Sequence, residues 1–273
     1  MLKLIKNSFI ITNDCIILAV PLIVFLSILG WYWNYSVDAI NTIPKFILAC
    51  ITMLVMSSGF VAAWLYMTKK TIELSKKVFV FDKDRAKALA KLVTALPKGL
   101  GKLFLPIIGV ISTYILIALI LFSIINFILA NTIGSFDFSN IDFTTLFLST
   151  ESIYEEIKLL SDNEILNLNL FYLLTIVGLT IISFLTMLWI PEIIYNEKNS
   201  YKALYFSIKK IFSTFKSSLL LFVYIYTLII LITILNTLLM FNPFLYFFVL
   251  LLYYYFLVYI VVLLFSYYEQ KFL

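Results

Sequence analysis

The sequence predicts an all-α, polytopic membrane protein with six transmembrane helices, and three observations lead to this prediction. First, 63% of the 273 residues are hydrophobic and only 13% are charged, about half the charged fraction of an ordinary soluble domain. Second, six apolar segments are each long enough to cross a hydrocarbon layer of about 30 Å as a helix. Third, the basic residues gather in alternate segments between these spans, the pattern that the positive-inside rule describes.

The six predicted spans follow one another without a linker or a break in composition, so 1–273 is predicted to be a single transmembrane domain. The spans cover residues 14–33, 46–67, 105–131, 169–190, 219–240 and 245–267. Trp31 and Trp33 end the first span, and indole rings favour the headgroup region of a bilayer. Only Phe241–Phe244 separates the last two spans, and the Asn-Pro pair in this turn predicts an antiparallel hairpin.

The distribution of charge predicts the orientation of the chain. Eighteen of the twenty basic residues fall in the N-terminal tail, in segments 68–104 and 191–218, and in the C-terminal tail. Because lysine and arginine accumulate in cytoplasmic segments, both termini are predicted to be cytoplasmic, with the spans in the inner (plasma) membrane. The outer segment 132–168 is acidic instead, and Ser152 with Glu155 forms a capping box that predicts a short helix from 152 to 160.

Both cytoplasmic loops are predicted to contain an amphipathic helix. The apolar stripes are Ile208, Ile211, Phe212 and Phe215 in the second loop, and Leu89, Leu92, Val93 and Leu96 in the first. Basic helices of this kind lie in the membrane interface with their lysines on anionic headgroups. The alternative is that they extend the spans and pack on each other. The candidate headgroup-binding residues are Lys87, Lys91, Lys98, Lys102, Lys202, Lys209, Lys210 and Lys216.

The two cytoplasmic loops also share a short sequence pattern. Residues 82–89 align without gaps on residues 197–204, and both read acidic-Lys-x-x-x-Lys-Ala-Leu. Parallel repeats occur in several transporter folds, so spans two and three are candidates for a copy of spans four and five. A chance match between two lysine-rich helices is the alternative.

The chemistry-bearing residues predict that this chain is not an enzyme. Histidine is absent, which removes the commonest general base and the commonest metal ligand. Gly99-Leu-Gly101 has no strand before it, so it predicts a helix end or an interface turn rather than a phosphate loop. Cys15 and Cys50 lie inside apolar runs and are predicted to be buried, unreactive thiols. No cofactor, metal or nucleic acid is expected.

The polar residues predicted to lie deep inside the spans are uncharged. Asp14 and Glu192 are predicted to lie near the cytoplasmic interface, and no ionisable residue lies in the middle of a span, which disfavours proton- or sodium-coupled transport. The deep polar side chains are Asn126, Asn236, Tyr253, Tyr254, Tyr255 and Tyr259. Such groups most often join helices by hydrogen bonds. A substrate passage lined by the tyrosines is the alternative interpretation.

The end of span four and the loop after it carry a resemblance to a known family. The stretch Leu188–Leu204, which includes Trp189-Ile190-Pro191-Glu192, leads through Ser207 and Lys209-Lys210 into an apolar span. It resembles the cytoplasmic turn of bacterial six-helix membrane proteins grouped with the membrane domain of glycerophosphodiester phosphodiesterases and related uncharacterised families. The resemblance implies a six-helix membrane domain. The phosphodiesterase chemistry of that group resides in a soluble domain that these residues do not contain, so no hydrolase activity is implied.

These observations favour a non-enzymatic integral membrane protein. It would organise membrane or lipid through its basic cytoplasmic helices, or serve as the membrane subunit of a larger assembly. Its expected partners are membrane lipids, anionic on the cytoplasmic face, and other membrane-protein subunits. The alternative is a permease, or a permease subunit, for a lipidic or apolar solute.

Overall fold

The computed structural model describes residues 1–14, 16–40, 42–77, 91–134, 161–239 and 241–273. In these ranges all regular elements are helices, and six are long and apolar enough to cross a membrane. The elements are α1 (Leu2–Asp14), η1 (Ile16–Leu18), α2 (Ala19–Ala39), α3 (Ile43–Ser75), η2 (Lys91–Thr94), α5 (Ala95–Thr132), α7 (Asp162–Thr186), α8 (Trp189–Tyr195), α9 (Ser200–Ser213), α10 (Phe215–Leu239) and α11 (Pro243–Phe272). The predicted all-α polytopic membrane fold is confirmed.

The helices run beyond the spans that hydropathy predicts. For example, α3 continues to Ser75 and α5 already begins at Ala95, because hydropathy marks the part in lipid whereas a helix continues through polar residues. The fourth predicted span is interrupted instead, between Thr186 and Trp189. Pro191 has no N–H to donate to the carbonyl of Met187, four residues earlier, and its ring crowds that carbonyl, so the helix breaks there.

Contacts divide the described chain into two compact units. Unit 1 consists of Met1–Ile111 and Leu185–Leu273, and unit 2 consists of Ser112–Phe184. The single domain predicted from the sequence stays a prediction.

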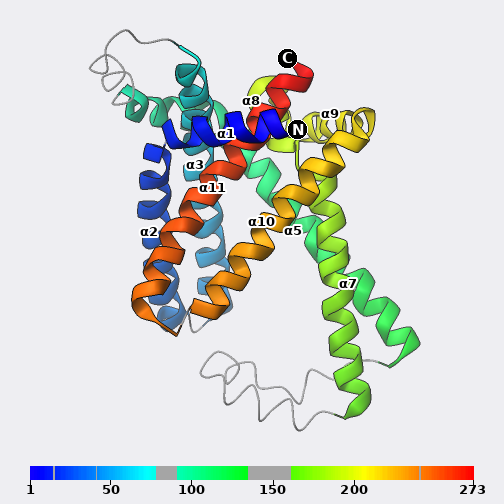
Figure 1. Ribbon diagram of the computed structural model, residues 1–273. Coiled ribbons are helices and arrows are strands. Elements are labelled where there is room, and N and C mark those ends of the chain that lie inside the picture. The colour runs from blue at the N-terminus through cyan, green and yellow to red at the C-terminus, as the bar shows by residue number, and fades with distance from the viewer. Residues whose placement is uncertain (15, 41, 78–90, 135–160, 240) are drawn as a thin grey trace. The chain divides into compact units, whose positions relative to one another are not determined.

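Unit 1 has two different ends (Figure 1). The first, which we call the terminal end, carries α1, α8, α9 and the C-terminal part of α11, and both chain termini lie there. The second, the hairpin end, carries the connections between α2 and α3 and between α10 and α11. At the α10–α11 connection, Asn242 caps α11 by accepting hydrogen bonds from the backbone N–H groups of Phe244 and Leu245. Pro243 then occupies the first turn, where a missing N–H costs nothing. This is the predicted Asn-Pro hairpin.

The N-terminal tail forms a helix, α1, that the sequence analysis did not predict. It lies across α11 near the terminal end (Figure 1). Phe9 meets the rings of Tyr255 and Tyr259 edge-on, at centroid distances of 6.0 and 6.3 Å. The Tyr255 hydroxyl donates a hydrogen bond of 2.6 Å to Asn13. The buried face of α1 consists of Leu4, Ser8 and Thr12.

The first turns of α5 approach α3 unusually closely. A Cβ atom added to Gly99 would lie 2.7 Å from Tyr66 Cβ and 3.0 Å from Ala63 Cα. Only glycine allows this contact, as is common where membrane helices pack through small residues. Gly99 therefore lies near the N-terminal end of α5, at a packing surface, and it is part of the helix rather than of a turn.

Unit 2 consists of the second part of α5 and most of α7. The rings of Phe122 and Phe171 lie 6.2 Å apart, and the Asn167 amide donates to the carbonyl of Gly134 at 2.9 Å. Gly134 has φ +120°, a conformation that favours glycine. The predicted outer helix from 152 to 160 lies outside the described residues.

Candidate functional site

A buried carboxylate stands at the centre of the terminal end of unit 1. Glu192 in α8 is 2% exposed. Its Oε2 accepts hydrogen bonds from Lys210 Nζ at 2.6 Å and from the Tyr268 hydroxyl at 2.5 Å. The amide of Asn196 lies 2.6 Å from the same hydroxyl. Because a lone buried charge is very costly, this pairing is what allows Glu192 to be buried. The network joins α8, α9 and α11.

The turn between α8 and α9 brings the two charged residues together. Asn199 caps α9, because its side-chain oxygen accepts from the backbone N–H groups of Tyr201 and Lys202, both at 3.1 Å. The indole of Trp189, which is fully buried, donates to the carbonyl of Ser200 at 2.7 Å. These bonds hold the start of α9 against α8. As a result Lys210, in the last turn of α9, reaches back to α8.

A second layer of polar contacts ties α3 to this network. The Tyr195 hydroxyl donates to Glu269 Oε1 at 2.8 Å, and Glu269 also forms an ion pair with Lys76. Lys69 Nζ donates to the carbonyl of Ile194 at 3.1 Å and lies 4.5 Å above the ring of Tyr195. A lysine at this position also satisfies the carbonyl end of α8, where the helix dipole favours a cation.

The contacts of this network hold the ends of α8, α9 and α11 together. The pair of Glu192 and Lys210 is neutral overall, and Tyr268 adds a bond to each charge. Among the described residues, no group of three or more metal-ligating side chains occurs.

Removing the hydroxyl at the centre of the network tests this interpretation. We expect Tyr268→Phe to lower the free energy of unfolding by about 1–3 kcal/mol, the cost of hydrogen bonds to charged groups. Tyr253→Phe is the matched control on the same helix, because Tyr253 is 42% exposed and its substitution should change stability by less than about 0.5 kcal/mol. Thermal unfolding of both variants in mild detergent measures the difference. Equal midpoints would contradict the role given to Tyr268.

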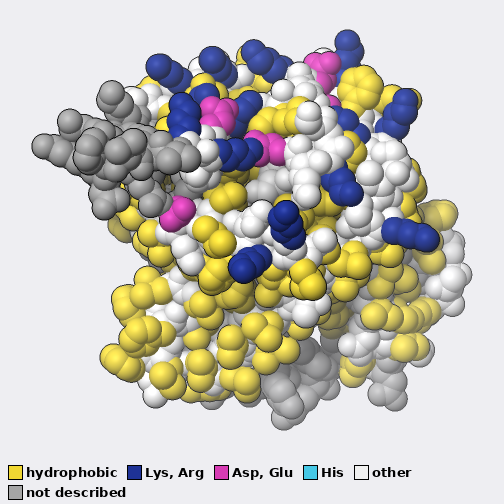
Figure 2. Space-filling model, turned by 45° about the horizontal axis from the view of Figure 1, so that its top comes forward, with side chains coloured by type: hydrophobic (Ala, Val, Ile, Leu, Met, Phe, Trp, Pro, Cys, Tyr) yellow, Lys and Arg dark blue, Asp and Glu magenta, His cyan; other side chains and the backbone are white. Residues whose placement is uncertain are grey.

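Of the predicted headgroup-binding lysines that the structure describes, most are exposed and one turns inward. Five are exposed at the terminal end, and we call them the terminal lysine surface: Lys98, Lys102, Lys202, Lys209 and Lys216. Figure 2 shows lysine side chains gathered over this end of unit 1, above a hydrophobic belt. Lys210 turns inward to Glu192. Lys87 and the side chain of Lys91 lie outside the described residues, as does the first copy of the predicted repeat.

Helix α9 has three faces rather than the predicted two. The inward face consists of Ala203, Ser207, Lys210 and Ile211. The second face is aromatic: Tyr201, Tyr205 and Phe212 are 69%, 65% and 59% exposed. The third carries Lys202 and Lys209, seven residues apart, and Lys216 continues it at the start of α10. Of the predicted apolar stripe, Ile211 is fully buried while Phe212 and Phe215 are exposed, because the packed face of α9 follows the small residues instead.

The polar residues predicted inside the spans have different surroundings. Tyr259 is buried and its hydroxyl lies 3.1 Å from that of Tyr224, while Tyr255 bonds to α1 as described above. These two make the interhelical bonds expected of deep hydroxyls. Tyr253 is exposed and Tyr254 half-buried. Asn126 and Asn236 are exposed, and among the described residues neither bonds to another helix. Cys50 is exposed as well, so its predicted burial is wrong.

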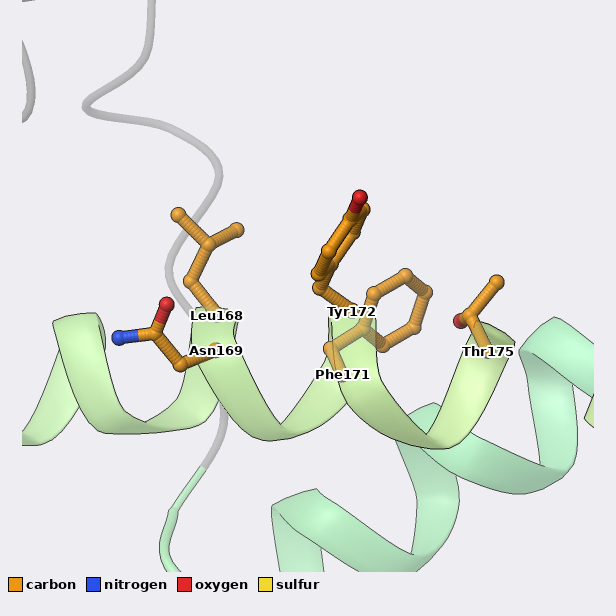
Figure 3. Close-up of a pocket in the computed structure, with 5 residues that line it drawn as sticks. All are labelled: Leu168, Asn169, Phe171, Tyr172 and Thr175. Carbon is orange, nitrogen blue, oxygen red and sulfur yellow. The ribbon is translucent and has the colours of Figure 1, made fainter. Parts of the chain in front are cut away.

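One hollow lies in unit 2, on the surface of α7 (Figure 3). Its volume is about 330 Å³, and its described lining is Leu168, Asn169, Phe171, Tyr172 and Thr175. All five come from neighbouring turns of one helix, and none is charged. These five side chains therefore include no carboxylate, amine, imidazole or thiol.

Comparisons with protein-family models, curated proteins and solved structures found no match. The resemblance to the membrane domain of the phosphodiesterase group therefore stays a prediction. Function has to be argued from the geometry and charge of this chain alone.

The sequence analysis missed the role of Glu192, although a signal was present. Glu192 stands within the run Leu188–Ile194, whose other members are all apolar. A carboxylate in such a run needs a cation from another segment if it is buried. The identity of that cation was not readable, because Lys209 and Lys210 are adjacent and only the rotation of α9 distinguishes them.

Proposed function

We propose that this chain is a non-enzymatic, multi-pass protein of the bacterial inner membrane that gathers anionic lipid on the cytoplasmic face through α9 and the terminal lysine surface. In this proposal both termini are cytoplasmic. The single observation that carries it is the arrangement of α9, which presents exposed aromatic rings and exposed lysines on adjacent faces while its inward face is packed against the protein.

An interfacial helix needs an apolar face toward the acyl chains and cations toward the headgroups. The exposed rings of Tyr201 and Tyr205 are of the type enriched at membrane interfaces, and the exposed ring of Phe212 adds apolar surface of the kind that interfacial helices bury. Lys202 and Lys209 follow on the neighbouring face, where a lysine near an anionic surface contributes about 1 kcal/mol to binding. The contacts to α8 hold the helix in one orientation, so both faces are available to lipid at once.

The distribution of lysines in unit 1 supports the proposed orientation. Apart from Lys45, the described lysines lie in five places: α1, the end of α3 with the two residues after it, η2 and the start of α5, the segment from α8 to the start of α10, and the end of α11. Lys45 stands at the hairpin end. A strong excess of lysine at one end of a bundle is typical of the cytoplasmic end.

The permease alternative has no support from the tyrosines on which it was based. Tyr255 and Tyr259 use their hydroxyls to join α11 to α1 and α10. A role as the membrane subunit of a larger assembly is compatible with the same lysine surface, and the experiment below separates the two.

The test compares the lipids that remain on the protein after extraction. We expect the triple variant K202Q/K209Q/K216Q to retain at least fivefold less phosphatidylglycerol than the native chain, because three cations near an anionic surface are lost. Purification in mild detergent followed by mass spectrometry of the bound lipids measures this retention. The stability of the protein should change little, because the three side chains are exposed.

The matched control is K202R/K209R/K216R, which keeps the three charges and should retain lipid as the native chain does. Equal retention in the glutamine variant would contradict the proposal. Co-purification of a stoichiometric protein partner, lost in the glutamine variant and kept in the arginine variant, would instead identify a membrane subunit that docks through this surface.

A further inference from the structure

Helix α1 presents an apolar face and a basic face side by side. Leu2 and Phe9 lie seven residues apart and are 83% and 50% exposed, so they stand on one face of the helix. Lys3 and Lys6 are exposed on the neighbouring face, and Ile10, which is 50% exposed, follows them one turn later. A helix that has cations beside an exposed apolar face has the composition of an interfacial helix.

The position of α1 in unit 1 is that of a helix at a membrane surface. Figure 1 shows α1 at the terminal end, where it runs across the direction of α2 and α3, as α9 does. Both α2 and α3 are long and apolar enough to cross a membrane. A helix that lies across them at one end is therefore parallel to the plane of the membrane.

The contacts of Phe9 show which side of α1 is directed toward the acyl chains. Its ring meets the rings of Tyr255 and Tyr259, which lie in the middle of α11. Since α11 is also long and apolar enough to cross a membrane, its middle lies at the level of the acyl chains. The face of Leu2 and Phe9 is therefore directed toward the acyl chains, and the lysines of the neighbouring face can extend their long side chains to the headgroups.

The packed face of α1 contributes little polar bonding to the rest of the protein. This face consists of Leu4, Ser8 and Thr12. The Ser8 hydroxyl is fully buried and has no hydrogen-bond partner among the described residues, and the Thr12 hydroxyl donates to the carbonyl of Ser8 within α1 at 2.8 Å. A helix of 13 residues is also marginal in water by itself. A second support on the exposed side would therefore add to the stability of α1.

We propose that α1 binds the lipid surface of the leaflet at the terminal end, with Leu2 and Phe9 against the acyl chains and the ammonium groups of Lys3 and Lys6 on the lipid phosphates. The contact residues are spread along α1, so the partner is the membrane surface rather than one molecule in a pocket. This surface belongs to a different helix from the terminal lysine surface, and its contact with lipid does not depend on that surface.

Fluorescence quenching in vesicles tests the proposal. The full chain with C15S/C50S carries one bimane-labelled substitution, Leu2→Cys or Asn7→Cys, and is reconstituted in a mixture of phosphatidylglycerol and phosphatidylcholine. Both positions are exposed and lie about 140° apart around the helix. We expect a nitroxide near the top of the lipid acyl chain to quench Leu2→Cys at least twofold more than Asn7→Cys, and aqueous iodide to quench Asn7→Cys at least twofold more than Leu2→Cys.

The double variant K3Q/K6Q tests the basic face of α1. We expect it to lower the acyl-chain quenching of Leu2→Cys at least twofold, because two cations near an anionic surface are lost. K3R/K6R is the matched control, which keeps both charges and should be quenched as the native chain is. Because both lysines are exposed, neither variant should affect folding.

Equal quenching of the two labelled positions by iodide, with no quenching by the nitroxide, would place α1 in water and overturn the proposal. Equal quenching of both positions by the nitroxide would place the whole helix among the acyl chains and overturn the interfacial assignment. Unchanged quenching in K3Q/K6Q would overturn the role given to the two lysines. The triple glutamine variant of the terminal lysine surface should leave the quenching of α1 unchanged, so this proposal and the one for α9 fail separately.

Discussion

Lys210→Ala is expected to lower the free energy of unfolding by about 3–5 kcal/mol, the cost of removing one partner from a buried ion pair. Glu192 is 2% exposed and would lose the ammonium group that contacts it at 2.6 Å. Tyr268 would still donate a hydrogen bond, but one hydroxyl does not replace a full positive charge. Thermal unfolding in mild detergent measures the effect.

The chain contains a matched control for this variant in the adjacent residue. Lys209 is exposed, so Lys209→Ala removes the same side chain and the same charge from the same helix at a cost of less than about 0.5 kcal/mol. The double variant E192Q/K210A should recover part of the lost stability, because a neutral amide replaces the unpaired charge. If Lys209→Ala and Lys210→Ala unfolded at the same temperature, the ion pair would have no structural role.

Gly99→Ala is expected to destabilise the protein by about 1–3 kcal/mol, the usual cost of overpacking. Two of the atoms that the new methyl group would meet are the Cα of Ala63 and the carbonyl oxygen of Ala62, at 3.0 and 3.1 Å. Both belong to the backbone of α3 and cannot rotate away. The start of α5 would therefore have to move away from α3, and contacts along that interface would be lost.

Gly101→Ala, two residues further along α5, should have the opposite effect. A Cβ atom at Gly101 meets nothing within 4 Å, and alanine is favoured over glycine in a helix by about 1 kcal/mol. We expect this variant to be as stable as the native chain or more stable. Unfolding midpoints measured side by side decide the matter, and destabilisation by both substitutions would show that close packing at Gly99 is not the cause.

Sequence reasoning reached the six helices because a bilayer imposes a simple rule. A segment in lipid has to be apolar over about 20 residues and has to satisfy its backbone bonds within one helix. Both conditions are local and can be read without knowing any contact. The break at the end of α7 was locally encoded too, since Pro191 removes one hydrogen bond at a known distance along the chain.

The candidate sites depended on which face of each helix is packed against the protein, and this orientation could not be read from the sequence. The lysines of the second loop were predicted to lie off the apolar stripe and to face headgroups. Lys209 is exposed as expected, whereas Lys210 is turned inward to Glu192. One residue corresponds to about 100° on a helix, so the packed face of α9 decided which lysine pairs and which is exposed.

The sequence alone determined that this is an all-α protein with six helices able to cross a membrane, and that its basic residues fall in alternate segments. Only the tertiary structure decided that α1 packs across α11, that Glu192 is buried and paired with Lys210, and that Gly99 contacts the backbone of α3. The physical reason is the range of the interactions. Transfer into lipid acts on each segment by itself, whereas a buried ion pair and a close helix contact exist only after distant segments have packed together.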